Sequence, residues 1–255
     1  MVDFLDELAK LAWDNVRSNY YSLNCKVKKV KGSLKEEISR SDIFIISEIK
    51  FSSPSFGDIR KDNILRVAEK MVKGGAKALS ILTEPKIFKG SLDGFLKVRE
   101  NFSIPLLMKD IIVDKVQIDC AEKIGANAIL LIMSLFDRRY IKEDLKDMIK
   151  YAHNLGLEVI LETQNLDEFK RALLTDADLI GINNRDLRDL SVNLERTREI
   201  LEKFNELPKL VVSESGIESK RDIDYLRSFG VKAFLIGTAI MKSKDIEAKV
   251  RELVG

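Results

Sequence analysis

The hydrophobic positions along the chain form short apolar runs that alternate with amphipathic segments. The runs are rich in β-branched residues and leucine and lack polar alternation, which is typical of parallel strands covered by helices on both faces. Between them, apolar residues recur at the three- and four-residue spacing of a helix with one buried face. We predict strands at 43–46, 78–82, 104–108, 128–132, 158–162, 178–182, 209–213 and 233–237, and helices at 63–73, 92–100, 114–124, 141–154 and 167–174, with one more helix after each of the last three strands.

This alternation predicts the fold class. Eight strand–helix units in 255 residues fit a (β/α)8 TIM barrel better than an open doubly wound sheet. We therefore expect a single (β/α)8 barrel domain that covers residues 1–255. A further amphipathic helix over residues 2–18, anchored by Trp13, precedes the first strand, so residues 1–40 form an N-terminal helical extension.

Charged and amide side chains follow the predicted strands, and a barrel of this class carries its active site at the carboxyl ends of its strands. Glu48 and Lys50 should project from the same face, because strand side chains alternate with a period of two. A layer of internal ion pairs would explain one such strand end, but five ends favour a site that binds charge or transfers protons. The other four ends carry Lys109 with Asp110, Glu162, Asn183 with Asn184 and Arg185, and Ser213 with Glu214 and Ser215.

The last two units carry a different feature. Ser215 and Gly216 follow the seventh strand, and Gly237 and Thr238 follow the eighth, where TAIM begins a short extra helix. Backbone N–H groups at such positions bind anions, and together they match the usual phosphate site of a barrel. Ser53, in the SSPS loop after the first strand, would add a contact; that loop is either a plain surface turn or a lid over the ligand.

Composition narrows the possible partners. A net charge of +2, spread along the chain, gives no electrostatic footprint for nucleic acid, and no apolar run is long enough for a membrane span. Cys25 and Cys120 lie far apart without metal-ligand spacing, so we expect reduced thiols in a cytoplasmic protein. The single histidine, His153, lies on a predicted helix, which leaves neither a zinc site nor a Ser-His-Asp triad. No dinucleotide-binding or P-loop glycine motif follows any strand.

Seven motifs between Ile43 and Met241 carry a resemblance: SEIKFSSPS, LTEPKIFKGS, LLMKD, ILLI, GINNRDL, VSESGI and FLIGTAIM, in this order. In them the chain resembles the indole-3-glycerol phosphate synthase family of tryptophan biosynthesis. The leading helix is also similar to that family's N-terminal extension, so we expect residues 1–40 to pack over the barrel mouth.

The resemblance implies a carbon–carbon lyase that closes the ring of 1-(2-carboxyphenylamino)-1-deoxyribulose 5-phosphate with loss of CO2 and water. It implies no metal and no organic cofactor. By position, Lys109 resembles the general acid at the carbonyl, Lys50 the second lysine near the substrate carboxylate and a proton donor in dehydration, and Glu162 the carboxylate in proton removal, while Glu48 would orient Lys50. The remaining implied residues are Asn183, Arg185, Glu214 and Ser215 for substrate binding, and Ser53, Gly216, Gly237 and Thr238 for phosphate binding.

Two positions depart from the family pattern. Ile111 stands where phenylalanine is usual, at the wall beside the anthranilate ring, and Ser52 stands where lysine or alanine is frequent. Neither position carries a proton-transfer group. We expect a small phosphorylated partner and a monomer.

Two alternatives stay open at this point. Another phosphate-binding barrel enzyme, such as a sugar-phosphate isomerase, would keep the phosphate features but lack the pair Lys50 and Lys109. A non-catalytic barrel would bind the anion without turnover.

Overall fold

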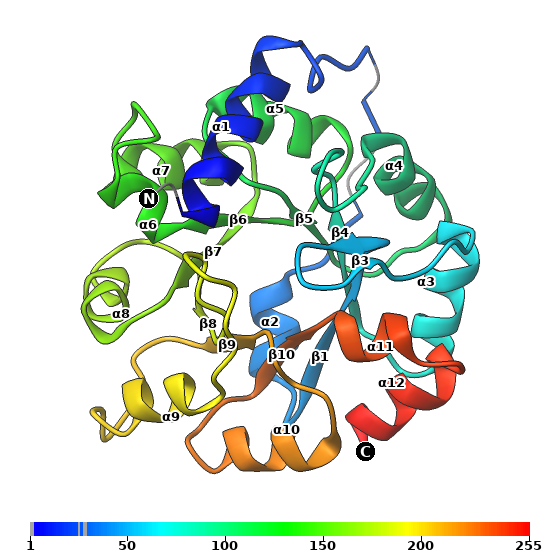
Figure 1. Ribbon diagram of the computed structural model, residues 1–255, viewed down its shortest axis with the longest axis vertical. Helices are drawn as coiled ribbons and strands as arrows, with labels where there is room; N and C mark the ends of the chain where they lie inside the picture. Colours follow the sequence, from blue (N-terminus) through cyan, green and yellow to red (C-terminus); the bar gives the residue numbers. More distant parts are fainter. Residues whose placement is uncertain (1–2, 25, 28–29) are drawn as a thin grey trace.

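Eight parallel strands close into a barrel in the computed structural model, which describes residues 3–24, 26–27 and 30–255. The helices form a ring outside this barrel (Figure 1). The strands are hydrogen-bonded in the order β1-β10-β9-β8-β7-β6-β5-β4, and the first and last of these pair with each other, so the predicted (β/α)8 fold is confirmed. The barrel strands are β1 (Phe44–Ile49), β4 (Ala78–Leu82), β5 (Leu106–Lys109), β6 (Ala128–Ile132), β7 (Glu158–Thr163), β8 (Leu179–Asn183), β9 (Val211–Glu214) and β10 (Ala233–Ile236).

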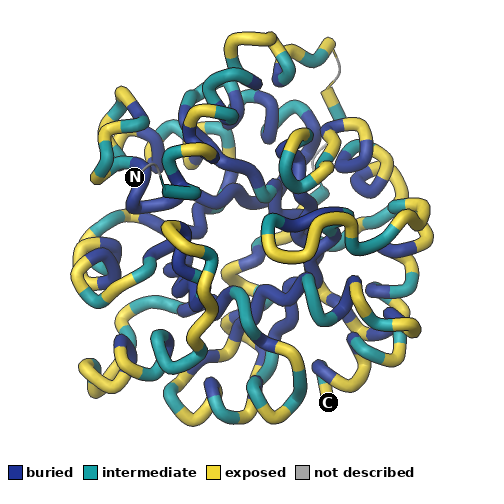
Figure 2. The backbone as a smooth tube through the Cα atoms, viewed as in Figure 1, coloured by how far each residue is buried: buried dark blue, intermediate teal, exposed yellow. Residues whose placement is uncertain are grey.

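The barrel strands are buried almost throughout, as their apolar sequences predict, and Figure 2 shows the buried backbone gathered around the barrel. Their bounds differ from the predicted ones by up to three residues. β1 extends to Ile49 and so includes Glu48, because the ladder is formed by backbone groups whatever the side chain. β5 begins after Pro105, which has no N–H to donate to a ladder.

Several of the outer helices begin after a residue whose side chain caps them. Asn63, Ser91 and Asp114, for example, each accept hydrogen bonds from backbone N–H groups of the first turn that follows. The helix predicted from residue 141 begins only after the N-cap residue Asp144. The ring consists of α3 (Ile64–Lys73), α4 (Leu92–Asn101), α5 (Lys115–Lys123), α7 (Leu145–Asn154), α8 (Leu166–Leu173), α9 (Glu195–Leu201), α10 (Lys220–Arg227) and α12 (Ile246–Val254).

Three short elements outside the regular strand–helix units follow the carboxyl ends of β1, β6 and β10. The loop after β1 contains a small hairpin, β2 (Ser52–Ser53) and β3 (Gly57–Asp58), which the sequence did not predict. A short helix, α6 (Met133–Asp137), follows β6 directly. The extra helix predicted after β10 is confirmed as α11 (Thr238–Lys242).

The N-terminal extension contacts both ends of the barrel. Helix α1 (Phe4–Arg17) lies near the carboxyl ends of the strands, where the Phe4 N–H donates to the carbonyl of Arg188 and the Trp13 indole donates to the carbonyl of Tyr140. Helix α2 (Leu34–Ser39) lies at the opposite end, where the Leu34 N–H donates to Glu158, the first residue of β7. Within the described ranges no helix has the length and apolar composition to cross a membrane.

Candidate active site

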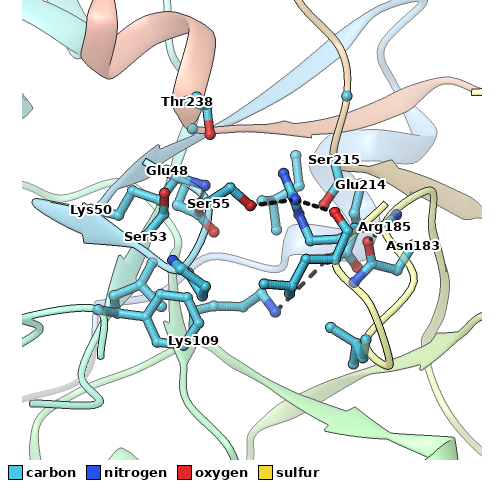
Figure 3. Close-up of a pocket in the computed structure, with 18 of the residues that line it drawn as sticks. Glu48, Lys50, Ser53, Ser55, Lys109, Asn183, Arg185, Glu214, Ser215 and Thr238 are labelled. Atoms are coloured by element: carbon cyan, nitrogen blue, oxygen red, sulfur yellow. Dashed lines mark hydrogen bonds and ion pairs between the residues drawn. The ribbon is translucent and has the colours of Figure 1, made fainter. Parts of the chain in front are cut away.

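A pocket with a volume of about 430 Å³ lies at the carboxyl ends of the barrel strands. Every one of the predicted site residues lines it, although they come from six strand ends and are spread over most of the chain (Figure 3). The barrel brings them together because all its strands run in one direction and so end on one face. They are Glu48, Lys50, Ser53, Lys109, Glu162, Asn183, Arg185, Glu214, Ser215, Gly216, Gly237 and Thr238.

Lys109, the last residue of β5, faces two carboxylates. Its Nζ lies 3.3 Å from Oε2 of Glu162 and 3.9 Å from Oε2 of Glu214. Burial by itself would lower the pKa of Lys109, but the nearby glutamates outweigh it and raise this pKa above its ordinary value. The other oxygen of Glu162 accepts a hydrogen bond of 2.9 Å from the amide of Asn183. Lys109 is therefore a protonated lysine at neutral pH, held beside an oriented carboxylate.

Glu214, at the end of β9, is the most perturbed acid of the pocket. Burial raises its pKa to about 8, Lys109 opposes the shift, and Glu162 and Glu48 add to it. Its Oε1 is buried and has no hydrogen-bond partner among the described residues. Gly181 leaves room for this carboxyl group, since a Cβ there would lie 2.5 Å from Oε1. Burial thus favours the protonated form of Glu214, and its Oε1 is available to a ligand.

Lys50 is paired with a different carboxylate from Lys109. Its Nζ lies 2.8 Å from Oε1 of Glu48, which confirms that the two side chains leave β1 on the same face. The register of β1 with β10 places Ser47 beside Ile236, so the following residues, Glu48 and Gly237, also face each other. A Cβ at Gly237 would overlap Oε1 of Glu48 and lie 3.0 Å from Cε of Lys50. A larger residue at this position would therefore displace the ion pair.

All four predicted phosphate-binding residues line the pocket, and Figure 3 shows Ser53 and Thr238 on the same side as Lys50. The hydroxyl of Ser53 is buried without a hydrogen-bond partner among the described residues. Ser215 and Gly216 have φ angles of 68° and 78°, a left-handed turn that an L residue such as Ser215 adopts at a cost of about 1 to 3 kcal/mol. Such strain persists only where the surrounding structure maintains it, and it is concentrated at functional sites.

Arg185 joins two loops at the mouth. Its Nη1 donates to the hydroxyl of Ser55 at 2.8 Å and to the carbonyl of Leu190 at 2.7 Å (Figure 3). Burial lowers its pKa from the ordinary arginine value, but the guanidinium stays charged. The first contact also positions the hairpin loop after β1 over the pocket.

The structure gives partners to a strand-end residue for which the sequence predicted no role of its own. Asp110, beside Lys109, is buried and accepts hydrogen bonds from Thr83, from the Ile111 N–H and, at 3.1 Å, from the hydroxyl of Tyr21. Burial raises the pKa of Asp110 to about 6. The contact with Tyr21 links segments 89 positions apart, and no local pattern predicts it. Apolar side chains also line the pocket, among them Phe4, Leu8, Phe88, Ile111, Ile132 and Leu187.

Residues set aside as structural lie away from the pocket. His153, on α7, contacts Asp178 at 2.9 Å, and Cys120 is buried in α5. Cys25 lies outside the described residues. Across the described ranges, no cluster of three or more His, Cys, Asp or Glu side chains is arranged to hold a metal ion. Ser52 is buried in β2 and does not line the pocket.

Fold and pocket together define a (β/α)8-barrel enzyme whose pocket combines lysine and arginine side chains with buried glutamates. The family model described as indole-3-glycerol phosphate synthase matches residues 6–253. The chain belongs to the indole-3-glycerol phosphate synthase family, whose members are carboxy-lyases of tryptophan biosynthesis.

Relatives across most of the chain agree with this. Indole-3-glycerol phosphate synthase of Methanocaldococcus jannaschii is 46% identical over 247 residues, which cover 94% of this chain and 90% of the relative. The enzyme of the same description from Petrotoga mobilis is 42% identical over 233 residues, 89% of this chain and 90% of the relative.

Solved structures of lower identity share the fold. An N-acetylmannosamine-6-phosphate 2-epimerase from Clostridium perfringens superposes with a TM-score of 0.62 at 15% identity, over 84% of this chain and 93% of that one. At such identity the likeness describes the barrel alone.

Proposed function

We propose that this pocket closes the ring of 1-(2-carboxyphenylamino)-1-deoxyribulose 5-phosphate to give indole-3-glycerol phosphate, CO2 and water. The reaction makes three demands on the protein. The ketone needs a proton donor as the new carbon–carbon bond forms, the resulting hydroxyl needs a second donor to leave as water, and a base must remove a proton to complete the indole ring. The phosphate and carboxylate of the substrate also need cations or backbone donors.

Lys109 supplies the first proton, to the ketone oxygen. The carboxylates around it keep it protonated, and Glu162 at 3.3 Å fixes the direction of its ammonium group. Glu162, oriented by Asn183, then serves as the group that removes a proton. The two residues lie within hydrogen-bond distance of each other and can act on neighbouring atoms of one substrate.

Lys50 supplies the second proton and attracts the negative charge of the substrate. Its ion pair with Glu48 holds it at the pocket wall, where β4 alone separates its strand from that of Lys109, and Gly237 leaves space for this pair. Arg185, Glu214, Ser215 and Asn183 place the substrate. Ser53, Gly216, Gly237 and Thr238 bind its phosphate.

The apolar lining accounts for the aromatic part of the substrate. Phe88, Ile111 and Ile132 line the pocket, and we assign them to the anthranilate ring. The usual family pattern has phenylalanine at the position of Ile111. Flat apolar contact does not require an aromatic partner, so the substitution is compatible with binding.

The observation that carries this proposal is the presence of two lysines in one pocket, each held by its own glutamate. A sugar-phosphate isomerase needs a phosphate edge and a proton-transfer residue, but it has no use for a second buried ammonium group. A non-catalytic anion-binding barrel has no use for Glu162 beside Lys109.

A turnover experiment tests the proposal. The purified chain is mixed with the synthetic carboxyphenylamino sugar phosphate, and the fluorescence of the indole product is followed. We expect product without added metal or cofactor, and an unchanged rate after dialysis against EDTA. A chain that binds this compound but forms no indole would contradict the assignment. We expect the active species to be a cytoplasmic monomer. Sedimentation of the purified chain tests its oligomeric state.

A further inference from the structure

Asn184 follows β8 directly and is fully buried, and none of the assignments above uses it. Its amide makes three hydrogen bonds. Nδ2 donates to the hydroxyl of Ser213 at 3.0 Å and to the carbonyl of Ser215 at 3.1 Å, and Oδ1 accepts from the hydroxyl of Thr197 at 2.7 Å. Both donors and the acceptor of this side chain are thus engaged, which is the condition under which a buried amide rigidifies its surroundings.

These hydrogen bonds fix the turn that carries Ser215, a strained residue of the pocket. The Asn184 N–H donates to the carbonyl of Glu214 at 2.9 Å, and its side chain holds the next carbonyl, that of Ser215. Asn184 therefore contacts two successive peptide groups, at the point where the chain enters the left-handed conformation of Ser215 and Gly216. Two hydrogen bonds from Asn184 thus maintain a conformation that costs energy locally.

The hydrogen bond from Asn184 to the Ser215 carbonyl also sets the direction of the next N–H group. In a planar trans peptide the C=O of one residue and the N–H of the next point in opposite directions. Holding the Ser215 carbonyl toward Asn184 therefore points the Gly216 N–H away from the buried network. Gly216 lines the pocket, and the described part of the chain supplies no acceptor for its N–H.

The network itself lies behind the pocket. Thr197 belongs to α9 and Ser213 to β9, their hydroxyls are 3.0 Å apart, and both residues are fully buried. Neither they nor Asn184 line the pocket. The side-chain amide of Asn184 reaches the pocket through its hydrogen bond to the Ser215–Gly216 turn.

We propose that Asn184 is a positioning residue that aims the Gly216 N–H at the phosphate group of the substrate, with Thr197 and Ser213 holding its amide. This rests on the phosphate assignment made above. Asn184 touches no reacting atom, so its removal weakens phosphate binding and leaves the proton-transfer groups in place.

The test uses inorganic phosphate as the probe, measured by calorimetry and by competition with substrate. Wild-type chain should bind phosphate competitively. Asn184→Ala should weaken phosphate about tenfold, equivalent to about 1.4 kcal/mol, and raise KM by a similar factor, while kcat falls less than threefold. Circular dichroism checks that the variant is folded. A folded Asn184→Ala with wild-type phosphate affinity would overturn the proposal.

Two threonine variants test whether the network affects phosphate binding even if Asn184→Ala does not fold. Thr197→Val keeps the side-chain shape but removes the hydrogen bond to Asn184, and should weaken phosphate two- to fivefold. Thr163→Val is its control, because it removes an equally buried hydroxyl, bonded at 2.8 Å to the carbonyl of Gly181 and unconnected to the turn. It should leave phosphate affinity within twofold, and equal effects of the two changes would refute a specific role for the network.

If the phosphate of the substrate does not bind at Ser53, Gly216, Gly237 and Thr238, the result would differ from that of a wrong role for Asn184. In that case phosphate would not compete with substrate in the wild-type chain, before any variant is compared.

Discussion

The ammonium group of Lys109 lies 3.3 Å from Oε2 of Glu162, although the two residues are 53 positions apart and belong to strands that are not neighbours in the barrel. β6 lies between β5 and β7, so the lysine reaches across one strand to meet the carboxylate. The register of the strands places Glu162 beside Ile132 on β6 and beside Gly181 on β8, where the absence of a side chain leaves space. The acid and the base that we propose for the reaction thus face each other in the pocket.

This pairing predicts the kinetic effect of removing the lysine. Lys109→Met should lower kcat and kcat/KM together, by about 10²-fold or more, with KM little changed, because a general acid stabilises charge that develops only in the transition state. Steady-state kinetics measures the change. Lys97→Met, which removes an exposed lysine paired with Asp93 on α4, should behave as wild type. A kcat near wild type for Lys109→Met would move the proton donor to Lys50.

Removal of the second lysine should have a different signature. Lys50→Met should raise KM as well as lower kcat, because the proposed mechanism has Lys50 attract the negative charge of the bound substrate in addition to donating a proton. The same steady-state assay, with the same Lys97→Met control, separates the two effects. An unchanged KM would show that Lys50 contributes nothing to substrate binding in the ground state.

Gly237 provides a test of the space around the Lys50–Glu48 pair. A Cβ at this position overlaps the Glu48 carboxylate, and overpacking of this kind costs about 1–3 kcal/mol. Gly237→Ala should therefore lower kcat/KM about tenfold or more. At Gly32 an added Cβ would lie 3.4 Å from Cγ of Pro105, so Gly32→Ala is a control that the structure tolerates. Equal activity of the two variants would contradict the close packing described here.

The raised pKa of Asp110 predicts that the free energy of unfolding depends on pH. Burial raises its pKa from 3.8 to about 6, so the folded state favours the protonated form. Its contribution to stability is then fully present below pH 4 and is lost as pH rises through 6. A shift of about two units corresponds to about 3 kcal/mol.

Asp110→Asn removes this titration while keeping a polar side chain for Tyr21 and Thr83. The free energy of unfolding of this variant, minus that of wild type, should increase between pH 4 and pH 7 by up to about 3 kcal/mol. Urea unfolding at several pH values measures it. A difference that stays flat or decreases over this range would mean that Asp110 is ionised in the folded protein well below pH 6.

The sequence determined the barrel and the membership of the pocket. Apolar runs such as 128–132 have to be covered on both faces, and eight of them in strict alternation with amphipathic segments leave few arrangements other than a closed parallel barrel. Once the strands are parallel, the groups at their carboxyl ends meet on one face. Residues as distant as Glu48 and Thr238 were therefore predictable as neighbours of one pocket.

Only the tertiary structure decided which of these groups touch. Whether Lys109 pairs with Glu162 or with Glu48 depends on strand register and barrel curvature, which arise from the packing of the whole chain and leave no local pattern. The same holds for Tyr21 on Asp110 and for Asn184 behind the Ser215 turn, where each hydrogen bond joins separate elements. Side-chain periodicity operates over a few residues and fixes the face that each group occupies, whereas partners, protonation and the aim of backbone donors are set by distances across the closed barrel.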